Sequence, residues 1–415
     1  MARSMLMGLA SIAAAALLAS PGAAQVNTAG QRNVHDPSRI HKVDGKYYLF
    51  YTGNSTTRIL SRSSTDLVNW TSSTGLFTTA PAWATAHVPS VSNFWAPDVV
   101  FVDGEYHLYY SVSTFGSQQS GMGLATNPTL NPSDPAYLWT DRGAVLTSTN
   151  GSPYNAIDPG IFLDDDSRMY MTFGSFWNGI YVTELDPLTG KRITPNSPTI
   201  RLAQNVPSTA IEAAYLHKHE DSYYLFVNFG TCCQGTNSTY NIRVGRSASP
   251  TGPFLDKNNV NMVSGGGSLF LGSEGSLVGP GHLSIYEEDN VEIFTYHYYD
   301  ATDNGRARLN WRTLDWSPDG WPVIADTLDP ADFNADGDVN GEDLAAWSQD
   351  FGSHGSDAPG DGVVDGADFV IWQRRQGAGA AAAGGALPEP GAMVLAAAVA
   401  AAAVGRRRRS SMGAR

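Results

Sequence analysis

Hydrophobic residues gather in short strand-like runs along this chain, and each run follows a turn of acidic or small polar residues. Five such turn-and-strand units occur, at residues 44–51, 103–110, 166–173, 221–227 and 289–296. In the first unit the turn Asp44-Gly45 precedes an aromatic-rich run that ends at Tyr51. The units are spaced by roughly 55 to 70 residues, a period typical of a propeller or a solenoid. The pattern predicts an all-β fold made of five repeated sheets.

A single titratable residue stands in the short apolar segment before each of these turns. The five residues are Asp36, Asp98, Asp158, Glu212 and His282. Each blade of a propeller begins with its innermost strand, so equivalent early positions of successive blades converge on the central axis. We therefore expect four carboxylates and a histidine to meet there, which indicates an active site.

The first residues of the chain are predicted to lie outside the propeller. Residues 1–24 contain the positive charge of Arg3, an apolar stretch and a run of small residues before Gln25. This order is typical of a secretory signal peptide, so we expect an exported protein. The propeller itself is predicted at residues 25–328.

Composition narrows the classes of partner. The chain has 415 residues, of which 42% are hydrophobic, and they include 10 Trp and 18 Tyr, enough for a large core. Its formal net charge is −14 at pH 7. An acidic surface repels nucleic acids and anionic lipids, so no nucleic-acid partner is expected.

The only two cysteines, Cys232 and Cys233, are adjacent. Neighbouring Cα atoms lie about 3.8 Å apart, which is shorter than the usual disulfide span. A bridge between them is one reading. The reading that we favour is two small, unbridged side chains in a loop, and in either case no framework of disulfides holds the fold.

Residues 329–376 have a different character and predict a small helical calcium-binding module. Oxygen-bearing side chains stand at the ligand positions of an EF-hand loop, at Asp332, Asn334, Asp336, Asp338, Asn340 and Asp343. Gly337 occupies the sixth position, where the loop turns sharply. The pattern recurs 25 residues later, and apolar helix-like stretches follow both copies, but Pro359 replaces one ligand of the second. The alternative is an acidic, solvated linker.

The pair of loops resembles a type I dockerin module. This resemblance implies a calcium ion in the first loop and a cohesin-like or cell-surface partner. After an Ala/Gly linker at 377–386, residues 387–415 combine Leu387-Pro388-Glu389-Pro390, a short apolar run and an arginine cluster at 406–409. This tail resembles a PEP-CTERM sorting signal, which implies transient anchoring in the inner membrane and removal by an exosortase-like protease. A simple tail anchor is the alternative.

The predicted axial carboxylates suit glycoside hydrolysis, which needs an acid for the leaving oxygen and a carboxylate on the other face of the sugar. Glu212 has small apolar neighbours in sequence and would face other carboxylates, so it is the natural proton donor. Asp36 follows His35 and is the natural base. The charge of Asp158 would raise the pKa of Glu212 by like-charge coupling. We expect a structural role for Asp98.

Eight segments together resemble glycoside hydrolase family 43, and within it the endo-α-1,5-L-arabinanases. They begin at His35, Trp95, Asn155, Gly174, Glu212, Cys232, Gly279 and His297. The likeness spans residues 33–323 in order. It implies a five-bladed β-propeller, inverting hydrolysis of arabinan, and the roles of base, acid and pKa modulator for Asp36, Glu212 and Asp158. It also implies a central metal, usually calcium, that is held by His282 and water.

The same resemblance implies residues that bind the sugar. Trp95, Phe176 and Trp177 would stack on the apolar faces of sugar rings, while Asn155 and Ser175 would hydrogen-bond to hydroxyl groups. Gly116 would let the backbone approach the ligand closely. The alternatives are that the aromatic residues only pack the blades and that His282 is a core histidine.

Two rival functions stay open. The first is a carbohydrate-binding propeller without catalysis, whose signature would be the loss of an axial acid; none is missing here. The second is an exo-acting arabinofuranosidase or xylosidase of the same family, because the sequence does not reveal whether loops close one end of the cleft.

Overall fold

The structure, a computed structural model, describes residues 26–325 and 331–379 except for 54–57, 73–74, 90, 92, 289, 318, 332, 334–338 and 353–363. Two units divide the chain, Met1–Ala325 and Asp326–Arg415. The predicted signal peptide, the sorting tail, and four of the six calcium ligands of the first loop (Asp332, Asn334, Asp336 and Asp338) lie outside the described residues.

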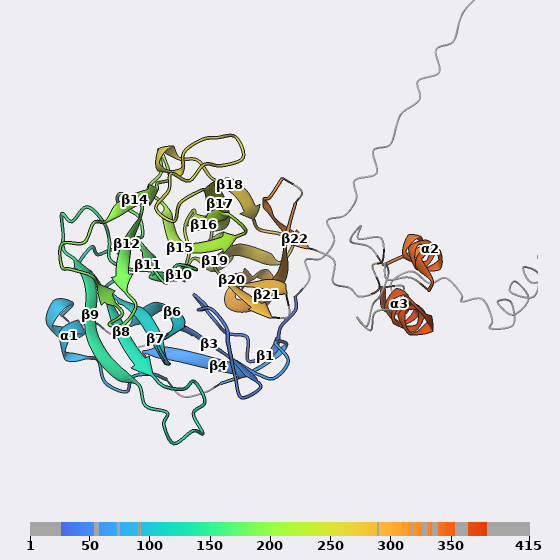
Figure 1. Ribbon diagram of the computed structural model, residues 1–415, viewed down its shortest axis with the longest axis horizontal. Coiled ribbons are helices and arrows are strands. Elements are labelled where there is room, and N and C mark those ends of the chain that lie inside the picture. Colours follow the sequence, from blue (N-terminus) through green and yellow to red (C-terminus); the bar gives the residue numbers. More distant parts are fainter. Residues whose placement is uncertain are drawn as a thin grey trace, which may run out of the picture. The chain divides into compact units, whose positions relative to one another are not determined.

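Five sheets surround a common axis in the first unit, so the predicted five-bladed β-propeller is confirmed (Figure 1). Their order is β1-β5-β4-β3-β2, then β6 to β9, β10 to β13 with β14 paired to β12, β15 to β18, and β19 to β22. The strands are β1 (Ala29–Gly30), β2 (His41–Val43), β3 (Lys46–Thr52), β4 (Ile59–Ser64), β5 (Asn69–Ser72), β6 (Phe94–Val102), β7 (Glu105–Val112), β8 (Ser120–Asn127), β9 (Thr140–Ser148), β10 (Gly160–Leu163), β11 (Met169–Phe173), β12 (Ile180–Asp186), β13 (Lys191–Arg192), β14 (Ile200–Ala203), β15 (Ile211–His219), β16 (Ser222–Phe229), β17 (Asn241–Ser247), β18 (Ser268–Leu271), β19 (Leu277–Glu288), β20 (Val291–Asp300), β21 (Arg306–Trp316) and β22 (Pro322–Ala325). Helix α1 (Ala82–His87) and three single 3-10 turns, η1 (Gly235–Asn237), η2 (Met262–Ser264) and η3 (Ala301–Asp303), lie in the connections.

The acidic turns of the sequence repeat are the hairpins between the first and second strands of the blades. Asp44 and Gly45 both have positive φ, 50° and 73°, and they join the paired residues Val43 and Lys46. A two-residue hairpin of this kind requires positive φ at both positions, which explains the Asp-Gly pair. The turn thereby fixes the register of the two strands.

The aromatic runs after these turns are the second strands, and both of their faces are buried. In β3 five consecutive residues are buried, from Tyr47 to Tyr51. Neighbouring blades cover both faces of such a strand, so its sequence is continuously apolar rather than alternating. Between the fourth and fifth blades, for example, Phe226 packs in one cluster with Phe294 and Tyr296. The core therefore consists of layers between blades, arranged around the axis.

The N-terminal segment joins the first blade to the last. β1 pairs in parallel with β5, and the backbone N–H of Asn27 donates to Oδ1 of Asn310 in β21 at 2.8 Å. The N–H of Leu309 in turn donates to the carbonyl of Arg32 at 2.8 Å. This segment closes the ring of sheets, and we call it the seam.

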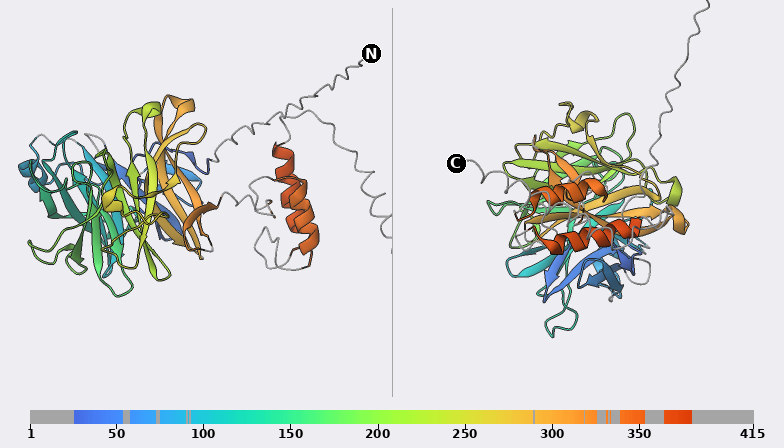
Figure 2. Two further views of the ribbon diagram at one scale, coloured as in Figure 1. Left: turned by 90° about the horizontal axis from the view of Figure 1, so that it is seen from above. Right: turned by 90° about the vertical axis from the view of Figure 1, so that its right-hand side faces the viewer.

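Two helices make up the described part of the second unit: α2 (Gly341–Asp350) and α3 (Gly366–Gly379), which lie side by side (Figure 2). Each helix carries a tryptophan whose Nε1 donates, at 2.8 Å, to a carbonyl before the other helix: Trp347 to Asp365 and Trp372 to Asn340. The 25-residue repeat of the sequence is thus a repeat of structure. α3 continues to Gly379, three residues into the predicted linker.

The two described ligand candidates of the first loop act as caps for α2. Oδ1 of Asn340 accepts the N–H of Glu342 at 2.7 Å, and Oδ2 of the buried Asp343 accepts the N–H of Asn340 at 2.6 Å. Across the described residues, no helix is both long enough and apolar enough to cross a membrane.

Candidate active site

A cleft of about 1010 Å³ opens at the axis of the propeller. All three predicted catalytic residues line it, and so do all six predicted sugar-binding residues: Asp36, Asp158, Glu212, Trp95, Gly116, Asn155, Ser175, Phe176 and Trp177. The structure therefore gathers, in one place, residues that are up to 176 positions apart, from Asp36 to Glu212.

The repeat positions that meet at the axis are offset from those that the sequence predicted. In each blade, one residue before or within the innermost strand has positive φ: Asp36 (54°), Ala96 (46°), Asp158 (59°), Ala213 (54°) and His282 (57°). Three of these strands also shift register at this point, as at a β-bulge. Asp36, Asp158 and His282 are therefore equivalent, whereas Glu212 stands one residue before the equivalent position and Asp98 two residues after it.

This offset explains why Asp98 is not in the cleft. The residues two positions after each positive-φ residue border a separate small axial cavity: Ser38, Asp98, Gly160, Tyr215 and Ser284. Oδ2 of Asp98 accepts the N–H of Ile161 at 2.8 Å and pairs with Nη2 of Arg39 at 3.4 Å. Asp98 thus ties together the first three blades, in agreement with the structural role that we expected for it.

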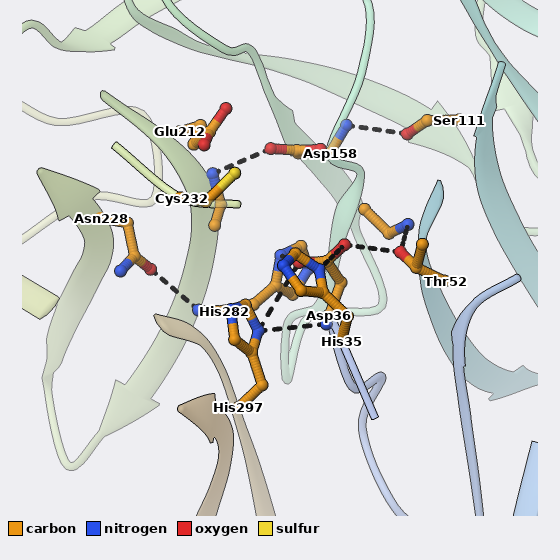
Figure 3. A network of polar contacts seen from close by, with 12 residues as sticks. His35, Asp36, Thr52, Ser111, Asp158, Glu212, Asn228, Cys232, His282 and His297 are labelled. Carbon is orange, nitrogen blue, oxygen red and sulfur yellow. Dashed lines mark hydrogen bonds and ion pairs between the residues drawn. The ribbon is translucent and has the colours of Figure 1, made fainter. Parts of the chain in front are cut away.

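Asp36 lies among hydrogen-bond donors (Figure 3). Its Oδ2 accepts from Oγ1 of Thr52 at 2.5 Å and lies 2.8 Å from Nδ1 of His35. Its Oδ1 lies 3.2 Å from Nδ1 of His282. Its backbone N–H donates to Nδ1 of His297 at 3.1 Å. Of these neighbours, the sequence assigned a role to His35 and His282, named His297 only as the start of a family segment, and gave no signal for Thr52.

These contacts keep Asp36 ionised. Burial alone would raise the pKa of Asp36, but the charges and hydrogen bonds of His35 and His282 hold this pKa well below its ordinary value. An ionised carboxylate at the floor of a cleft can accept a proton, so Asp36 suits the role of a general base.

Glu212 has the opposite surroundings, because it is buried with few charges of opposite sign. Its Oε2 accepts from Oγ of Ser175 at 2.6 Å, and its Oε1 accepts from the hydroxyl of Tyr240. The Ser175 hydroxyl donates its proton to Glu212, so its oxygen is left to accept a hydrogen bond from a sugar hydroxyl, and its role in sugar binding stays a prediction. Sequence reasoning missed Tyr240, which stands just before β17 with no motif of its own, and only the fold brings it to the cleft.

Asp158 completes the acidic side of the cleft. Its N–H donates to Oγ of Ser111 at 2.9 Å, and its Oδ2 accepts the N–H of Ala213 at 3.2 Å. Burial, followed by the charge of Glu212, raises the pKa of Asp158 to about 8. Burial also raises the pKa of Glu212, against the hydrogen bonds of Ser175 and Tyr240. Near neutral pH the two carboxyl groups therefore share a proton, and their titration belongs to the pair.

His282 is the only predicted metal ligand of the propeller. Asp36 faces its Nδ1, so Nε2 is the nitrogen that could bind a metal. His282 also borders the polar axial cavity. Calcium prefers six to eight oxygen ligands, so this donor set fits the ion only if water supplies most of them.

Aromatic side chains and strained backbone form the rim of the cleft. Phe176 and Trp177 both have positive φ, 53° and 40°, and both are half-buried. Such backbone is costly for bulky residues and is retained where the surroundings impose it, often at functional sites. Phe115, next to Gly116, is 81% exposed and was missed by the sequence reasoning, although an exposed aromatic in a loop is a signal for binding. The buried Oδ1 of Asn155 has no partner among the described residues.

The predicted unbridged state of the two cysteines is wrong. Cys232 and Cys233 form a disulfide with each other, and the pair lines the cleft. Sγ of Cys233 lies 3.8 Å from Nε2 of His35. The short distance between the Cα atoms of neighbouring residues disfavours such a bond. Cys233, however, has a φ of 68°, a local conformation that the sequence does not reveal.

Comparisons with known proteins identify relatives of the whole propeller. The model of glycosyl hydrolases family 43 matches residues 27–322. An extracellular endo-α-(1→5)-L-arabinanase of Bacillus subtilis is 40% identical over 318 residues, which cover 75% of this chain and 95% of that protein. An extracellular exo-α-(1→5)-L-arabinofuranosidase of Cellvibrio japonicus is 40% identical over 307 residues, which cover 71% of this chain and 87% of that protein.

The fold agrees with these relatives. The structure of a Cellvibrio cellulosa α-L-arabinanase in complex with arabinohexaose superposes with a TM-score of 0.66 at 38% identity. The match covers 70% of this chain and 95% of that chain.

Proposed function

This chain belongs to glycosyl hydrolases family 43, and from that membership we propose that it hydrolyses the α-1,5-linked L-arabinofuranosyl backbone of arabinan by internal cuts. It is a glycosidase whose relatives act on this linkage, and one related arabinanase binds an oligosaccharide of six arabinose units. The observation that carries the proposal is the cleft itself, where an ionised Asp36 stands with a carboxyl pair that keeps a proton.

The proposed reaction is a single displacement. Glu212 gives its proton to the glycosidic oxygen, and the bond between this oxygen and the anomeric carbon breaks. Asp36 accepts a proton from a water molecule, whose oxygen attacks the anomeric carbon from the opposite face. The product then has inverted configuration, and the carboxyl groups of Asp36 and Glu212 are expected to lie roughly 6.5–9.5 Å apart to leave space for the water. Asp158 keeps the proton on the acidic side by like-charge coupling.

Product analysis tests this proposal. On linear debranched arabinan we expect a rapid fall in viscosity and a series of oligosaccharides, with slow release of nitrophenol from nitrophenyl arabinofuranoside. Release of only the monosaccharide, or a preference for the nitrophenyl substrate, would favour exo action, as in the Cellvibrio japonicus relative. Binding of arabinan without any cleavage would instead favour a non-catalytic binding propeller.

We also propose that His282 and water hold a calcium ion at the centre of the propeller. Such an ion would add positive charge beside Asp36 and favour the ionised carboxylate. The proposal rests on Nε2 of His282, the ring nitrogen that does not face Asp36, and on the polar axial cavity that this residue borders. Metal analysis of the purified protein should find a calcium ion that is absent in His282→Ala.

The second unit is proposed to be a dockerin-like module that binds calcium chiefly through its first loop. The supporting observation is the structural repeat of α2 and α3, with Trp347 and Trp372 in equivalent contacts. Calorimetry of the full chain should show a tight calcium site that is lost in Asp343→Ala and retained in His282→Ala. Such a module would bind a cohesin-like or cell-surface partner.

Export and transient anchoring are proposed for the ends of the chain. Two of the relatives are extracellular proteins, and residues 1–24 have the pattern of a signal peptide. The apolar run in 387–415 is shorter than the ~20 residues that span a bilayer, and an exosortase-like protease would remove it. Mass spectrometry of mature protein from its own host should find no peptide beyond Gly391.

A further inference from the structure

We propose that Tyr299 and His35 form a positioning relay that holds the carboxylate of Asp36 in place and begins at the disulfide-bonded loop of Cys232 and Cys233. The proposal rests on the assignment of Asp36 as the base of the proposed reaction. It assigns no chemical step to the relay. Its two side chains act only through Asp36.

The relay is a continuous series of hydrogen bonds across three blades. The backbone N–H of Cys233 donates to the hydroxyl oxygen of Tyr299 at 2.7 Å. That hydroxyl lies 2.8 Å from Nε2 of His35. Nδ1 of His35 lies 2.8 Å from Oδ2 of Asp36. The series thus connects the rim of the cleft, from the fourth blade through β20 of the fifth, to the carboxylate of the first.

Every polar group in this series can be paired. The ionised carboxylate of Asp36 only accepts hydrogen bonds, so Nδ1 of His35 must carry the proton. Nε2 of His35 accepts the hydroxyl proton of Tyr299 when the ring is neutral and donates to the hydroxyl oxygen when the ring is charged, so the contact of 2.8 Å is kept in both states. Burial is the main reason why the pKa of Tyr299 is raised, so this hydroxyl stays protonated and available to donate. Its oxygen remains free to accept the N–H of Cys233.

A second histidine keeps the His35 ring in its plane. His297 stacks on His35 with ring centroids 4.0 Å apart and an interplanar angle of 24°. Nδ1 of His297 accepts the N–H of Asp36, so it carries no proton. Burial, followed by the charge of His35, holds the pKa of His297 well below its ordinary value, which keeps this ring neutral. The imidazole of His35 is therefore restrained by its edge and by its face.

The relay restrains the one oxygen of Asp36 that His282 does not face. Oδ2 accepts from His35 and Thr52, while Oδ1 faces His282. Rotation of the carboxylate would break contacts on both oxygens at once. Misplacement of a catalytic group by a small distance lowers the rate with little effect on binding. The relay should therefore affect kcat and leave KM nearly unchanged.

The experiment is the substitution Tyr299→Phe, which removes one hydroxyl group and keeps the ring. On linear arabinan we expect kcat to fall about tenfold, as for one lost hydrogen bond near 1.4 kcal/mol, with KM within about twofold of the wild type. The matched control is Tyr296→Phe in the same strand, whose hydroxyl contacts Asn310 instead of the site. This control should retain the wild-type kcat. Equal losses in both variants would show a structural effect and overturn the proposal.

A double-mutant cycle tests whether the relay acts through Asp36. In the Asp36→Asn background there is no base to position, so Tyr299→Phe should not lower the residual rate further. A further tenfold loss in that background would overturn the proposal. Likewise, replacing both cysteines by serine should lower kcat in the wild type but not in Tyr299→Phe. An unchanged kcat in the serine variant would show that the loop is not part of the relay.

A spectroscopic measurement separates this proposal from the proposed function, because it needs no activity. Proton NMR of the wild type should show a hydrogen-bonded imidazole N–H resonance that is absent in His35→Gln. Tyr299→Phe should shift it, and Tyr296→Phe should not. If these spectra were observed for a protein without arabinanase activity, the relay contacts would stand and the assignment of Asp36 as a catalytic base would be wrong. An unshifted resonance in Tyr299→Phe would overturn the relay even in an active enzyme.

Discussion

The two sides of the cleft contain the same kind of group in opposite states. On one side, Asp36 is surrounded by His35, His282 and the hydroxyl of Thr52, and its pKa is held well below the ordinary value. On the other side, Asp158 and Glu212 are buried near each other, and both pKa values are raised. Solvent access does not distinguish them, since all three carboxyl groups are buried.

The difference teaches that neighbours, and not burial, assign the roles. Burial favours the neutral form of every carboxyl group. On the first side the histidine contacts reverse this effect, whereas on the second side a like charge reinforces it. A base and an acid can therefore be made from nearly identical side chains, and a change of neighbours should alter the roles in a predictable direction.

The largest expected effect on kcat comes from removing the charge of Asp36 or the acidic proton of Glu212. Asp36→Asn and Glu212→Gln should each lower kcat on arabinan by about 10²–10⁴-fold, the usual contribution of a general acid or base. Glu212→Gln should retain more activity on aryl arabinosides, because a good leaving group needs little protonation. Steady-state kinetics on both substrates measures the contrast. The same loss for both variants on both substrates would contradict the assignment of sides.

An intermediate effect is expected from Asp158→Asn, which removes one of the two coupled carboxyl groups of the acidic side. In the folded protein the raised pKa of Asp158 keeps a proton that the unfolded chain, with a pKa of about 3.9, releases. Between about pH 4 and pH 8 the folded state binds more protons, so its stability falls as the pH rises. Asp158→Asn should remove this dependence and be more stable than the wild type at pH 7.5, by an amount on the order of 1–3 kcal/mol.

Thermal unfolding at pH 4.5 and 7.5 measures this effect, with Ser111→Ala as the control, because it removes only the hydroxyl that accepts the N–H of Asp158. We also expect kcat of Asp158→Asn to fall by about 10²-fold. If Asp158→Asn lost stability at pH 7.5, the like-charge account of the acidic side would have to be abandoned.

The smallest expected effect concerns Tyr240, which donates to Glu212. The hydroxyl lowers the pKa of Glu212 against the effect of burial, so Tyr240→Phe should raise this pKa further. The alkaline limb of the pH–rate profile should then move to higher pH, by about half a unit to one unit, with kcat at its optimum lowered severalfold. A profile that moves to lower pH would show that Tyr240 does not act on the acid.

Several parts of this arrangement could be predicted from the sequence. The acidic turns and aromatic runs repeat five times because each blade needs the same hairpin and the same doubly buried strand, as in Asp44-Gly45 and β3. Asp36, Asp158 and Glu212 could be proposed because each stands near the start of an innermost strand. These features depend on the local sequence, so they can be recognised without the structure.

Other parts could not be predicted, because they depend on backbone angles or on contacts between blades. The offset of Glu212 and Asp98 follows from positive φ at Ala213 and Ala96, and alanine gives no signal for that conformation. Tyr240 and Thr52 reach the site only through the fold. The disulfide of Cys232 and Cys233 was not predicted, because the usual Cα–Cα span of disulfides does not describe this loop.

The seam also imposes an order on the folding of the newly synthesised chain. Asn27 and Asn310 are 283 positions apart, so the contact that joins them forms only when nearly the whole propeller has been synthesised. Contacts between such distant segments form slowly, because a long loop must close first. Until then the first and last blades lack the contacts that join them, and the apolar cluster that they share, which includes Trp70 and Leu309, stays incomplete and open to association with other chains. The N-terminal residues of the propeller therefore complete their contacts last, and newly synthesised chains are the most exposed to aggregation.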